Sequence, residues 1–172
     1  MSTGVLLVSA ALAGPGFTSA CMKAPPADVQ AAPAFELADL AGGKVSLDSL
    51  KGKVVILDFW ATWCGPCIAE IPDYVSFWQK NRARGVEVVG VVFESGEPQD
   101  VQDFVREHRI PYRQLLGTEQ VQEAFGANQG FPTTYVIDGT GVIRHKILGA
   151  TPGKFDRLQQ AVDAALAQRA GS

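Results

Sequence analysis

The sequence predicts an α/β fold in which a central mixed sheet is flanked by helices. Two near-continuous apolar runs are typical of strands buried on both faces of a parallel sheet: residues 53–61 (KVVILDFWA) and 86–93 (VEVVGVVF). Helical spacing of apolar residues follows each run, as in βαβ units. With 172 residues, 47% of them apolar, the chain can form one domain with a sizeable core, which excludes wholesale disorder.

The charge pattern argues against nucleic acid as a partner. The formal net charge is −3, and no run rich in Lys and Arg occurs. Proteins that bind the phosphate backbone normally show a basic face, so we expect no nucleic-acid partner. The sequence also has no uncharged apolar run of about 18 residues, the length that would indicate a membrane-spanning helix.

The N-terminal segment has the pattern of an export signal. An apolar stretch at residues 5–13 (VLLVSAALA) suits the core of a signal peptide, and small residues lead into Cys21 as in a bacterial lipoprotein signal. We therefore expect a signal peptide at 1–20, a lipidated Cys21 with a Pro/Ala-rich tether at 21–33, and a folded domain at 34–170. A plain secretory signal and a disordered cytosolic N-terminus are the alternatives.

A β-hairpin opens the folded part. Two short segments of strand character, residues 35–40 and 44–47, flank a glycine turn at 41–43. The first apolar run then leads directly into a helix that begins near Cys64. Because the reactive groups of open α/β sheets lie beyond the carboxyl ends of strands, residues 63–67 occupy the predicted position of a functional site.

The second half of the chain repeats strand and helix. The second apolar run is followed by a helix that starts at Pro98 and by a short helix at 119–125. Two further strands, 133–138 and 142–148, form an antiparallel hairpin around a Gly-Thr-Gly turn. An amphipathic helix over 155–166 closes the domain.

The most specific feature is the run Cys64-Gly65-Pro66-Cys67. Two cysteines at this spacing can close a small disulfide ring, and the helix N-terminus stabilises a thiolate on the first of them. We predict that Cys64, in an exposed position, is the nucleophile and that Cys67 resolves the mixed disulfide. Zinc would need two more ligands, and the sequence has no second CxxC or paired histidines. We therefore expect no metal, and no cofactor besides a redox-active Cys64–Cys67 disulfide; a purely structural bridge is the other alternative.

Beyond this motif, the chain resembles the TlpA/ResA-like branch of thioredoxin-fold proteins, which are exported or membrane-anchored thiol–disulfide oxidoreductases of bacteria. The resemblance covers about residues 33–167. It is carried by residues 59–67 (FWATWCGPC), Glu70, Pro72, residues 130–134 (GFPTT), residues 136–138 (VID) and Gly141. It implies a thioredoxin fold with an N-terminal hairpin extension.

The resemblance also implies how substrate is bound. The peptide bond before Pro132 is expected to be cis and to pack opposite the two cysteines, and the flanking backbone is expected to pair with an extended substrate. The substrate-binding residues implied are Trp63, Gly65, Pro66, Phe131, Pro132 and Thr133.

Two carboxylates are further candidates for the catalytic site. Asp58 interrupts an apolar strand, where burial should raise its pKa. It lies six residues before Cys64, where thioredoxins carry the buried acid that exchanges a proton with the second cysteine. Glu70 follows Cys67 by three residues on the same helix face, and the family carries a glutamate there. An aspartate bonded to backbone at a sheet edge and a solvated helix glutamate are the alternatives.

The predicted function is reduction of disulfides in exported proteins. Gly65-Pro66 matches reducing thioredoxins, and relatives of this family reduce haem-site cysteines of apocytochrome c or metal-site cysteines. The expected partners are disulfide-bearing proteins, a membrane thiol carrier as electron donor, and the membrane itself through the lipid anchor. We expect a monomer in the periplasm or on the extracytoplasmic face of a bacterial membrane.

Two other classes of function remain as alternatives. A copper-handling module of the same fold usually has a CxxxC motif and a distant histidine, whereas this chain has CxxC. A thiol peroxidase would place threonine three residues before the reactive cysteine, where this chain has Ala61.

Overall fold

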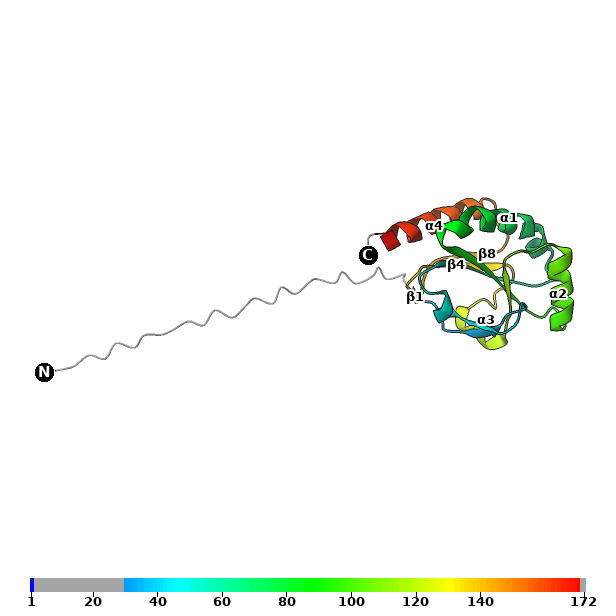
Figure 1. The fold of residues 1–172 in the computed structure, drawn as a ribbon, viewed down its shortest axis with the longest axis horizontal. Coiled ribbons are helices and arrows are strands. Elements are labelled where there is room, and N and C mark those ends of the chain that lie inside the picture. Colours follow the sequence, from blue (N-terminus) through cyan, green and yellow to red (C-terminus); the bar gives the residue numbers. More distant parts are fainter. Residues whose placement is uncertain (2–29, 171–172) are drawn as a thin grey trace.

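The computed structural model describes residue 1 and residues 30–170. The predicted signal peptide, the predicted lipidation at Cys21 and most of the predicted tether lie outside the described residues. The described chain forms a six-stranded mixed sheet with helices on both faces, as the sequence predicts, and a separate two-stranded hairpin (Figure 1). None of the helices in this described part is long and apolar enough to cross a membrane.

Six strands form the main sheet. Their spatial order is β1 (Gln30–Ala31), β8 (Val142–Leu148), β7 (Thr133–Ile137), β4 (Val54–Trp60), β5 (Val86–Val92) and β6 (Arg113–Leu116). β4, β5 and β6 are parallel, whereas β7, β8 and β1 are each antiparallel to their neighbours. The parallel strands therefore end at one edge, where the loop after β4 leads to the cysteines.

β4 lies in the middle of the sheet, and all seven of its residues are buried. This position explains why the strand is a nearly continuous apolar run. Asp58 is the exception, and in the register of the sheet it lies opposite Gly90 of β5 on one side and Thr134 of β7 on the other.

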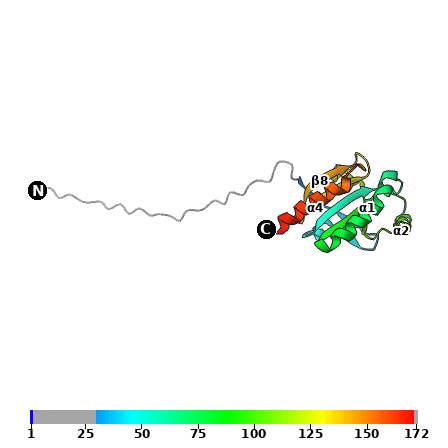
Figure 2. The ribbon, with the colours of Figure 1, turned by 90° about the horizontal axis from the view of Figure 1, so that it is seen from above.

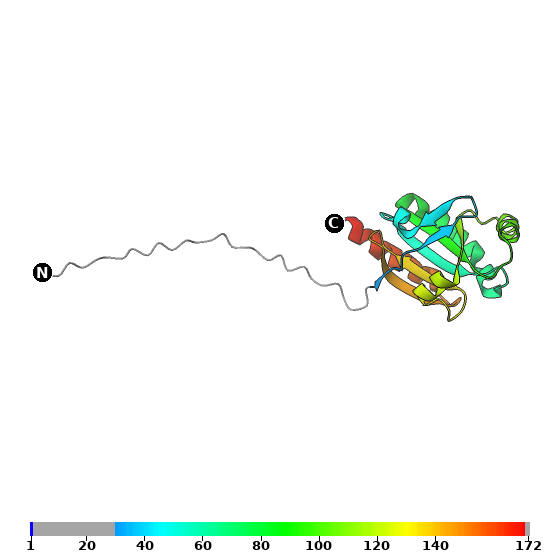
Figure 3. The same ribbon diagram turned by 90° about the horizontal axis from the view of Figure 1, so that it is seen from below.

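Helices α1 (Gly65–Asn81) and α4 (Lys154–Ala170) lie next to each other on one face of the sheet (Figures 1 and 2). Helix α2 (Pro98–Glu107) connects β5 to β6 at one end of the molecule. The opposite face is covered by α3 (Glu119–Phe125) and by the hairpin of β2 (Glu36–Ala38) and β3 (Lys44–Ser46), seen from below in Figure 3. Two short 3-10 helices complete the described elements, Leu47–Leu50 and Arg82–Arg84.

The two faces of the sheet carry different cores. On the α3 side, Leu57 and Phe59 of β4 belong to an apolar cluster in which the rings of Phe59 and Phe125 lie 5.3 Å apart. On the α1 side, Ile56 and Trp60 belong to a cluster that also contains both cysteines of the CxxC motif and Tyr74, whose hydroxyl donates to the buried Asp58. The chemistry is therefore confined to one face of β4.

Two short strands differ from the sequence prediction. No strand is predicted at 113–116 (RQLL), yet β6 forms there by pairing with β5. The domain is predicted to begin at Ala34, whereas Gln30 and Ala31 already pair with β8. Segments this short have too few residues to show an alternating pattern, so only their tertiary pairing defines them.

Candidate active site

The CxxC motif lies where β4 passes into α1. Cys64 is the N-cap residue of α1, and its Sγ accepts a hydrogen bond from the backbone N–H of Cys67 at 3.3 Å. Cys64 and Cys67 are joined in a disulfide. The helix N-terminus therefore presents its free N–H groups to the first sulfur, the arrangement that stabilises a thiolate.

The prediction that Cys64 is exposed is wrong for this disulfide form. Cys64 is 6% exposed and Cys67 is 4% exposed, so the two differ little. Cys64 belongs to the buried cluster of the α1 face together with Trp60 and Ala61. Beside the disulfide, Trp63 is 60% exposed, and Gly65 and Pro66 are exposed as well.

The loop after β5 holds the active-site loop in place. The Trp63 Nε1–H donates to the carbonyl oxygen of Glu94 at 2.8 Å, and the Thr62 backbone N–H donates to Ser95 Oγ at 2.9 Å. Ser95 Oγ in turn donates to the carbonyl oxygen of Phe93 at 2.8 Å. Ser95 does not stand out in the sequence, because a serine between a glutamate and a glycine gives no signal of such a contact.

The peptide bond between Phe131 and Pro132 is cis, as the resemblance implies. The Phe131 ring lies 6.0 Å from the Trp63 ring and stacks on Phe93 at 5.5 Å, so the loop before β7 contacts the CxxC loop. Thr133 is buried, and its hydroxyl donates to the carbonyl oxygen of Gly130 at 2.7 Å.

The predicted substrate-binding residues therefore fall into two groups. Trp63, Gly65 and Pro66 have exposed side chains or surfaces, and Phe131 is partly exposed beside them. Pro132 and Thr133 are buried together with their backbone, and the Pro132 carbonyl oxygen accepts a hydrogen bond from the Gly149 N–H at 2.7 Å.

Asp58 is buried below the motif and bonded to two hydroxyl groups. Tyr74 Oη and Thr134 Oγ1 each donate to Asp58 Oδ1 at 2.7 Å. Burial raises the pKa of Asp58, while the charge of Lys154 and the two hydroxyl hydrogen bonds oppose this rise. The alternative of an aspartate at a sheet edge is wrong, because β4 is central.

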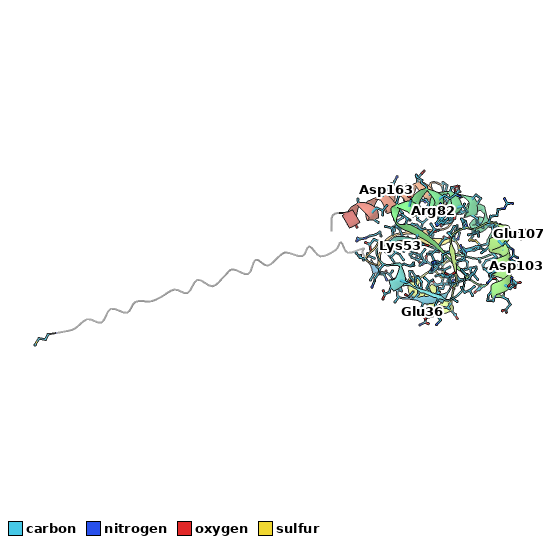
Figure 4. All side chains as sticks on the ribbon, viewed as in Figure 1. Glu36, Lys53, Arg82, Asp103, Glu107 and Asp163 are labelled. Carbon is cyan, nitrogen blue, oxygen red and sulfur yellow. A yellow bond between two sulfur atoms is a disulfide. The ribbon has the colours of Figure 1, made fainter. Side chains whose placement is uncertain are left out.

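Glu70 is also buried, so the alternative interpretation as a solvated helix carboxylate does not apply. Its Oε2 accepts a hydrogen bond from Lys154 Nζ at 2.6 Å, and both partners are shielded from solvent. Burial raises the pKa of Glu70, and the hydrogen bond and charge of Lys154 oppose the rise. The buried set contrasts with charged residues such as Glu36, Asp103 and Glu107, which lie at the periphery in Figure 4.

Three residues of this buried polar set are missing from the predicted site. Tyr74 follows Cys67 by seven residues, so its position on the same helix face could have been found from spacing. Thr134 lies within residues 130–134, which carry part of the family resemblance. Its hydrogen bond to Asp58, however, depends on the register between β7 and β4. Lys154, at the start of α4, gives no local signal, because its partners come from β4 and α1.

The arrangement can carry out dithiol–disulfide exchange. It combines a cysteine pair at a helix N-terminus, an exposed aromatic side chain beside it, and a buried carboxyl with raised pKa on the strand that feeds the motif. Within the described residues no group of three His, Cys, Asp or Glu side chains could hold a metal ion.

Comparisons with known proteins agree with this chemistry. Residues 29–146 match the family described as AhpC/TSA. "Thioredoxin-like protein YneN" of Bacillus subtilis (strain 168) is 36% identical over 136 residues, which cover 78% of each chain. A "Thiol-disulfide oxidoreductase ResA" of Bacillus cereus is 34% identical over 125 residues, 69% of this chain and 68% of the relative.

A solved structure shows the same architecture. The thiol:disulfide interchange protein of the thioredoxin family from Chlorobium tepidum TLS is 31% identical and superimposes with a TM-score of 0.71. The match covers 83% of this chain and 99% of that protein, so the fold assignment extends over the whole of the solved domain.

Proposed function

We propose that this chain, which belongs to the AhpC/TSA family and is a thiol–disulfide oxidoreductase of thioredoxin fold, reduces disulfide bonds in exported proteins. The observation that carries the proposal is the Cys64–Cys67 disulfide at the N-terminus of α1. The Gly65-Pro66 pair between the cysteines favours the reducing direction, because it matches reducing thioredoxins. The reaction needs no further cofactor, since the two sulfur atoms carry both electrons.

The reaction begins with the reduced pair. The Cys64 thiolate attacks one sulfur of the substrate disulfide, forms a mixed disulfide and expels the other substrate sulfur as a thiolate. Cys67 then loses its proton and attacks Cys64 Sγ. This step breaks the mixed disulfide, releases the second substrate thiolate and leaves the Cys64–Cys67 disulfide. Two electrons pass to the substrate, and a dithiol carrier in the membrane supplies them again.

Asp58 takes the proton of Cys67 in the second step. A buried thiol ionises with difficulty, so its attack requires a nearby base. Asp58 lies in the same buried region, and burial brings its pKa up from the ordinary value of 3.8 toward the range in which a carboxylate exchanges protons readily. Tyr74 and Thr134 fix the orientation of the carboxylate through their hydrogen bonds.

Trp63 and Phe131 form the apolar contact for the substrate. Their rings lie 6.0 Å apart, between the CxxC loop and the cis-proline loop. An extended segment of the substrate would pair with the backbone next to Pro132, at the partly exposed Phe131, while its disulfide reaches Cys64. Gly65 and Pro66 are exposed beside Cys64 and would border the bound substrate.

The protein acts outside the cytoplasm as a monomer, and a lipid on Cys21 anchors it to the membrane. The apolar stretch at 5–13 and the small residues before Cys21 support this location. Cys21→Ala should release the protein from the membrane fraction or leave it unprocessed. Wild-type protein found soluble with an unmodified N-terminus would reject the lipid but not export.

The function is tested by trapping. Cys67→Ser cannot resolve the mixed disulfide, so substrates should accumulate on Cys64 and be identified by mass spectrometry. Cys64→Ser is the matched control and should trap nothing. Exported proteins with reducible cysteine pairs among the trapped partners support the proposal, and their absence contradicts it.

The direction is tested by the redox potential. Equilibration with glutathione buffers should give a value nearer to that of thioredoxin, about −270 mV, than to that of a strong oxidant, about −120 mV. A value above about −180 mV would contradict the reducing role. Rapid consumption of hydrogen peroxide would favour a peroxidase instead.

A further inference from the structure

Lys154 is a buried cation in the polar set of the α1 face. Its side chain is 1% exposed, and its Nζ donates to Glu70 Oε2 at 2.6 Å. The same ammonium lies 5.1 Å from the centre of the Tyr74 ring. Removing an ammonium from water is costly unless opposite charge compensates it, so this lysine is held by its neighbours.

Tyr74 connects this cation to Asp58. Its ring faces the Lys154 ammonium, and its hydroxyl donates to Asp58 Oδ1 at 2.7 Å. The charge of Lys154 lowers the pKa of Asp58 against the rise that burial causes. Lys154 thus acts on two carboxylates, by direct contact with Glu70 and through space on Asp58.

The Lys154–Glu70 ion pair also lies against a cavity at the surface. Glu70 and Lys154 line a cavity of about 450 Å³ together with Asp73, Thr151 and Asp156. Glu70 lines this cavity and Asp58 does not, so Glu70 is the carboxylate of the two that can exchange a proton with water there.

The charges of the three groups favour uptake of one proton. With both carboxyls ionised, Lys154, Glu70 and Asp58 sum to −1, and with one of them protonated the sum is zero. A buried cluster that becomes neutral when it takes a proton avoids the cost of net buried charge. The proton that Cys67 loses is such a proton.

We propose that Lys154 is a positioning residue for thiol–disulfide exchange, whose ammonium is the shared counter-charge of Glu70 and Asp58. It keeps Asp58 in the ionised form that can accept a proton, and it keeps Glu70 as a carboxylate at the cavity. The role of Lys154 in the exchange reaction rests on the proposed function, in which Asp58 is the acceptor.

The resolution step moves one proton and one electron pair. The Cys67 thiol gives its proton to the Asp58 carboxylate, and the resulting thiolate attacks Cys64 Sγ as the bond to the substrate sulfur breaks. The substrate leaves with both electrons of that bond. Without Lys154, a larger share of Asp58 is already protonated and cannot take the proton, so this step slows.

The other titratable groups around Lys154 do not replace it. Asp73 and Tyr74 come from α1, Tyr112 from the segment before β6, and Asp156 from α4 itself, while Cys67 lies in the same buried cluster as the two tyrosines. Burial, together with the negative charges of Asp58 and Glu70, raises the pKa of both tyrosines far above neutrality. Among all these groups Lys154 is the cation.

The test is a titration of the Asp58 carboxyl carbon by ¹³C NMR in the reduced, full-length protein. Lys154→Met should raise the midpoint by about one pH unit, the size expected for a unit charge roughly 10 Å away, across the Tyr74 ring, at an effective dielectric constant of about 20. Glu70→Gln should lower it, since the whole field of Lys154 then acts on Asp58. Lys53→Met is the control, because Lys53 forms a 2.8 Å pair with Glu87 at the surface.

The double variant Lys154→Met/Glu70→Gln keeps the test valid if Lys154→Met alone does not fold. Both buried partners are then uncharged, and the Asp58 midpoint should lie above that of Glu70→Gln by a similar amount. Coincident midpoints in the double variant and Glu70→Gln, or in Lys154→Met and wild type, would overturn the proposal.

A kinetic measurement separates this proposal from the proposed function. The acid limb of the resolution rate should move to higher pH in Lys154→Met, in step with the NMR midpoint. A shifted titration with an unchanged resolution profile would reject Lys154 as a positioning residue. A wild-type protein that exchanges no disulfides would contradict the proposed function, while the titration would still show whether Lys154 acts on Asp58.

Discussion

Asp58 and Asp138 are buried to nearly the same extent, 5% and 6% exposed, but they have different partners. Asp58 accepts hydrogen bonds from two neutral hydroxyls on one oxygen. Asp138, in the turn after β7, accepts from the backbone N–H groups of Thr140 and Val142, from the Thr140 hydroxyl and from Arg144 Nε at 2.6 Å.

The pKa values of the two carboxyls move in opposite directions. Burial raises the pKa of Asp58, and its partners offset only part of the rise. Burial would also raise the pKa of Asp138, but the hydrogen bonds from Thr140, Val142 and Arg144 lower it below the ordinary value. The depth of a carboxyl below the surface and its hydrogen-bond partners therefore decide together whether it can accept a proton. Asp138 is a fixed anion that shapes a turn, whereas Asp58 remains able to take up a proton.

The largest expected effect is on turnover. Asp58→Asn should slow reduction of a protein disulfide by roughly 10²–10⁴-fold, because a general base is lost with almost no change in volume. Asp138→Asn should leave turnover within about twofold of wild type when assayed where both proteins are folded. Equal losses in the two variants would remove the distinction between them.

The next largest effect is on stability. Here Asp138→Asn should be affected more than Asp58→Asn, whereas for turnover the reverse is expected. Asp138→Asn should lower the free energy of unfolding by about 1–3 kcal/mol, since it weakens a charged hydrogen-bond network in a turn. Asp58→Asn should leave stability unchanged or raise it, because the cost of a buried carboxylate disappears. Urea denaturation at neutral pH measures both, and a strongly destabilised Asp58→Asn would show that Asp58 has a structural role.

The contributions of Asp58 and Asp138 to the free energy of unfolding should change with pH in opposite directions. The unfolded chain loses the Asp58 proton near pH 3.8, before the folded protein does, so ionisation of Asp58 costs stability from there up to its raised folded pKa. The stability of Asp58→Asn relative to wild type should therefore increase as pH rises above about 4.

Asp138 should show the opposite slope. Its contribution is present above pH 3.8 and is lost as pH falls through its lowered folded pKa. The deficit of Asp138→Asn should thus shrink below about pH 4. Denaturation of the two variants and wild type over a series of acidic pH values checks both slopes, and slopes of the same sign would contradict the comparison.

The smallest effect concerns the hydroxyl groups that hold Asp58. Tyr74→Phe removes one of its two donors, so stability should fall by about 1 kcal/mol and the acid limb of resolution should move slightly to higher pH. Tyr135→Phe is the matched control, since that hydroxyl donates to the Phe125 carbonyl oxygen on the other side of the sheet at 2.7 Å. If the acid limb of the resolution rate also shifts in Tyr135→Phe, a general loss of stability would explain both shifts.

The sequence predicts the parts of this molecule that depend on local pattern. The β4 run, the helix after Cys64 and the short helix α3 follow from apolar spacing, and their positions are confirmed. Strand β6 is missed because four residues carry too little pattern, and only the neighbouring strand β5 decides that they pair.

The same limit applies to the active site. Cys64 and Cys67 stand out along the chain by their spacing, and Asp58 stands out as a charged residue within an apolar run. Lys154 is separated from Glu70 by 84 positions, and its contact exists only because α4 packs against α1. The exposure expected for Cys64 fails for a similar reason, since its burial depends on packing with residues of other strands and helices.

The most direct test of Asp58 as the acceptor of the Cys67 proton follows the two half-steps of the reaction separately. Reaction of the reduced protein with a chromogenic aromatic disulfide releases one thiolate when Cys64 attacks and a second when Cys67 resolves, so stopped-flow absorbance gives both rates. Over about pH 6 to 9, Asp58→Asn should attack at the wild-type rate but resolve roughly 10²–10⁴-fold more slowly. Unchanged resolution across that range would show that Asp58 does not take the proton of Cys67.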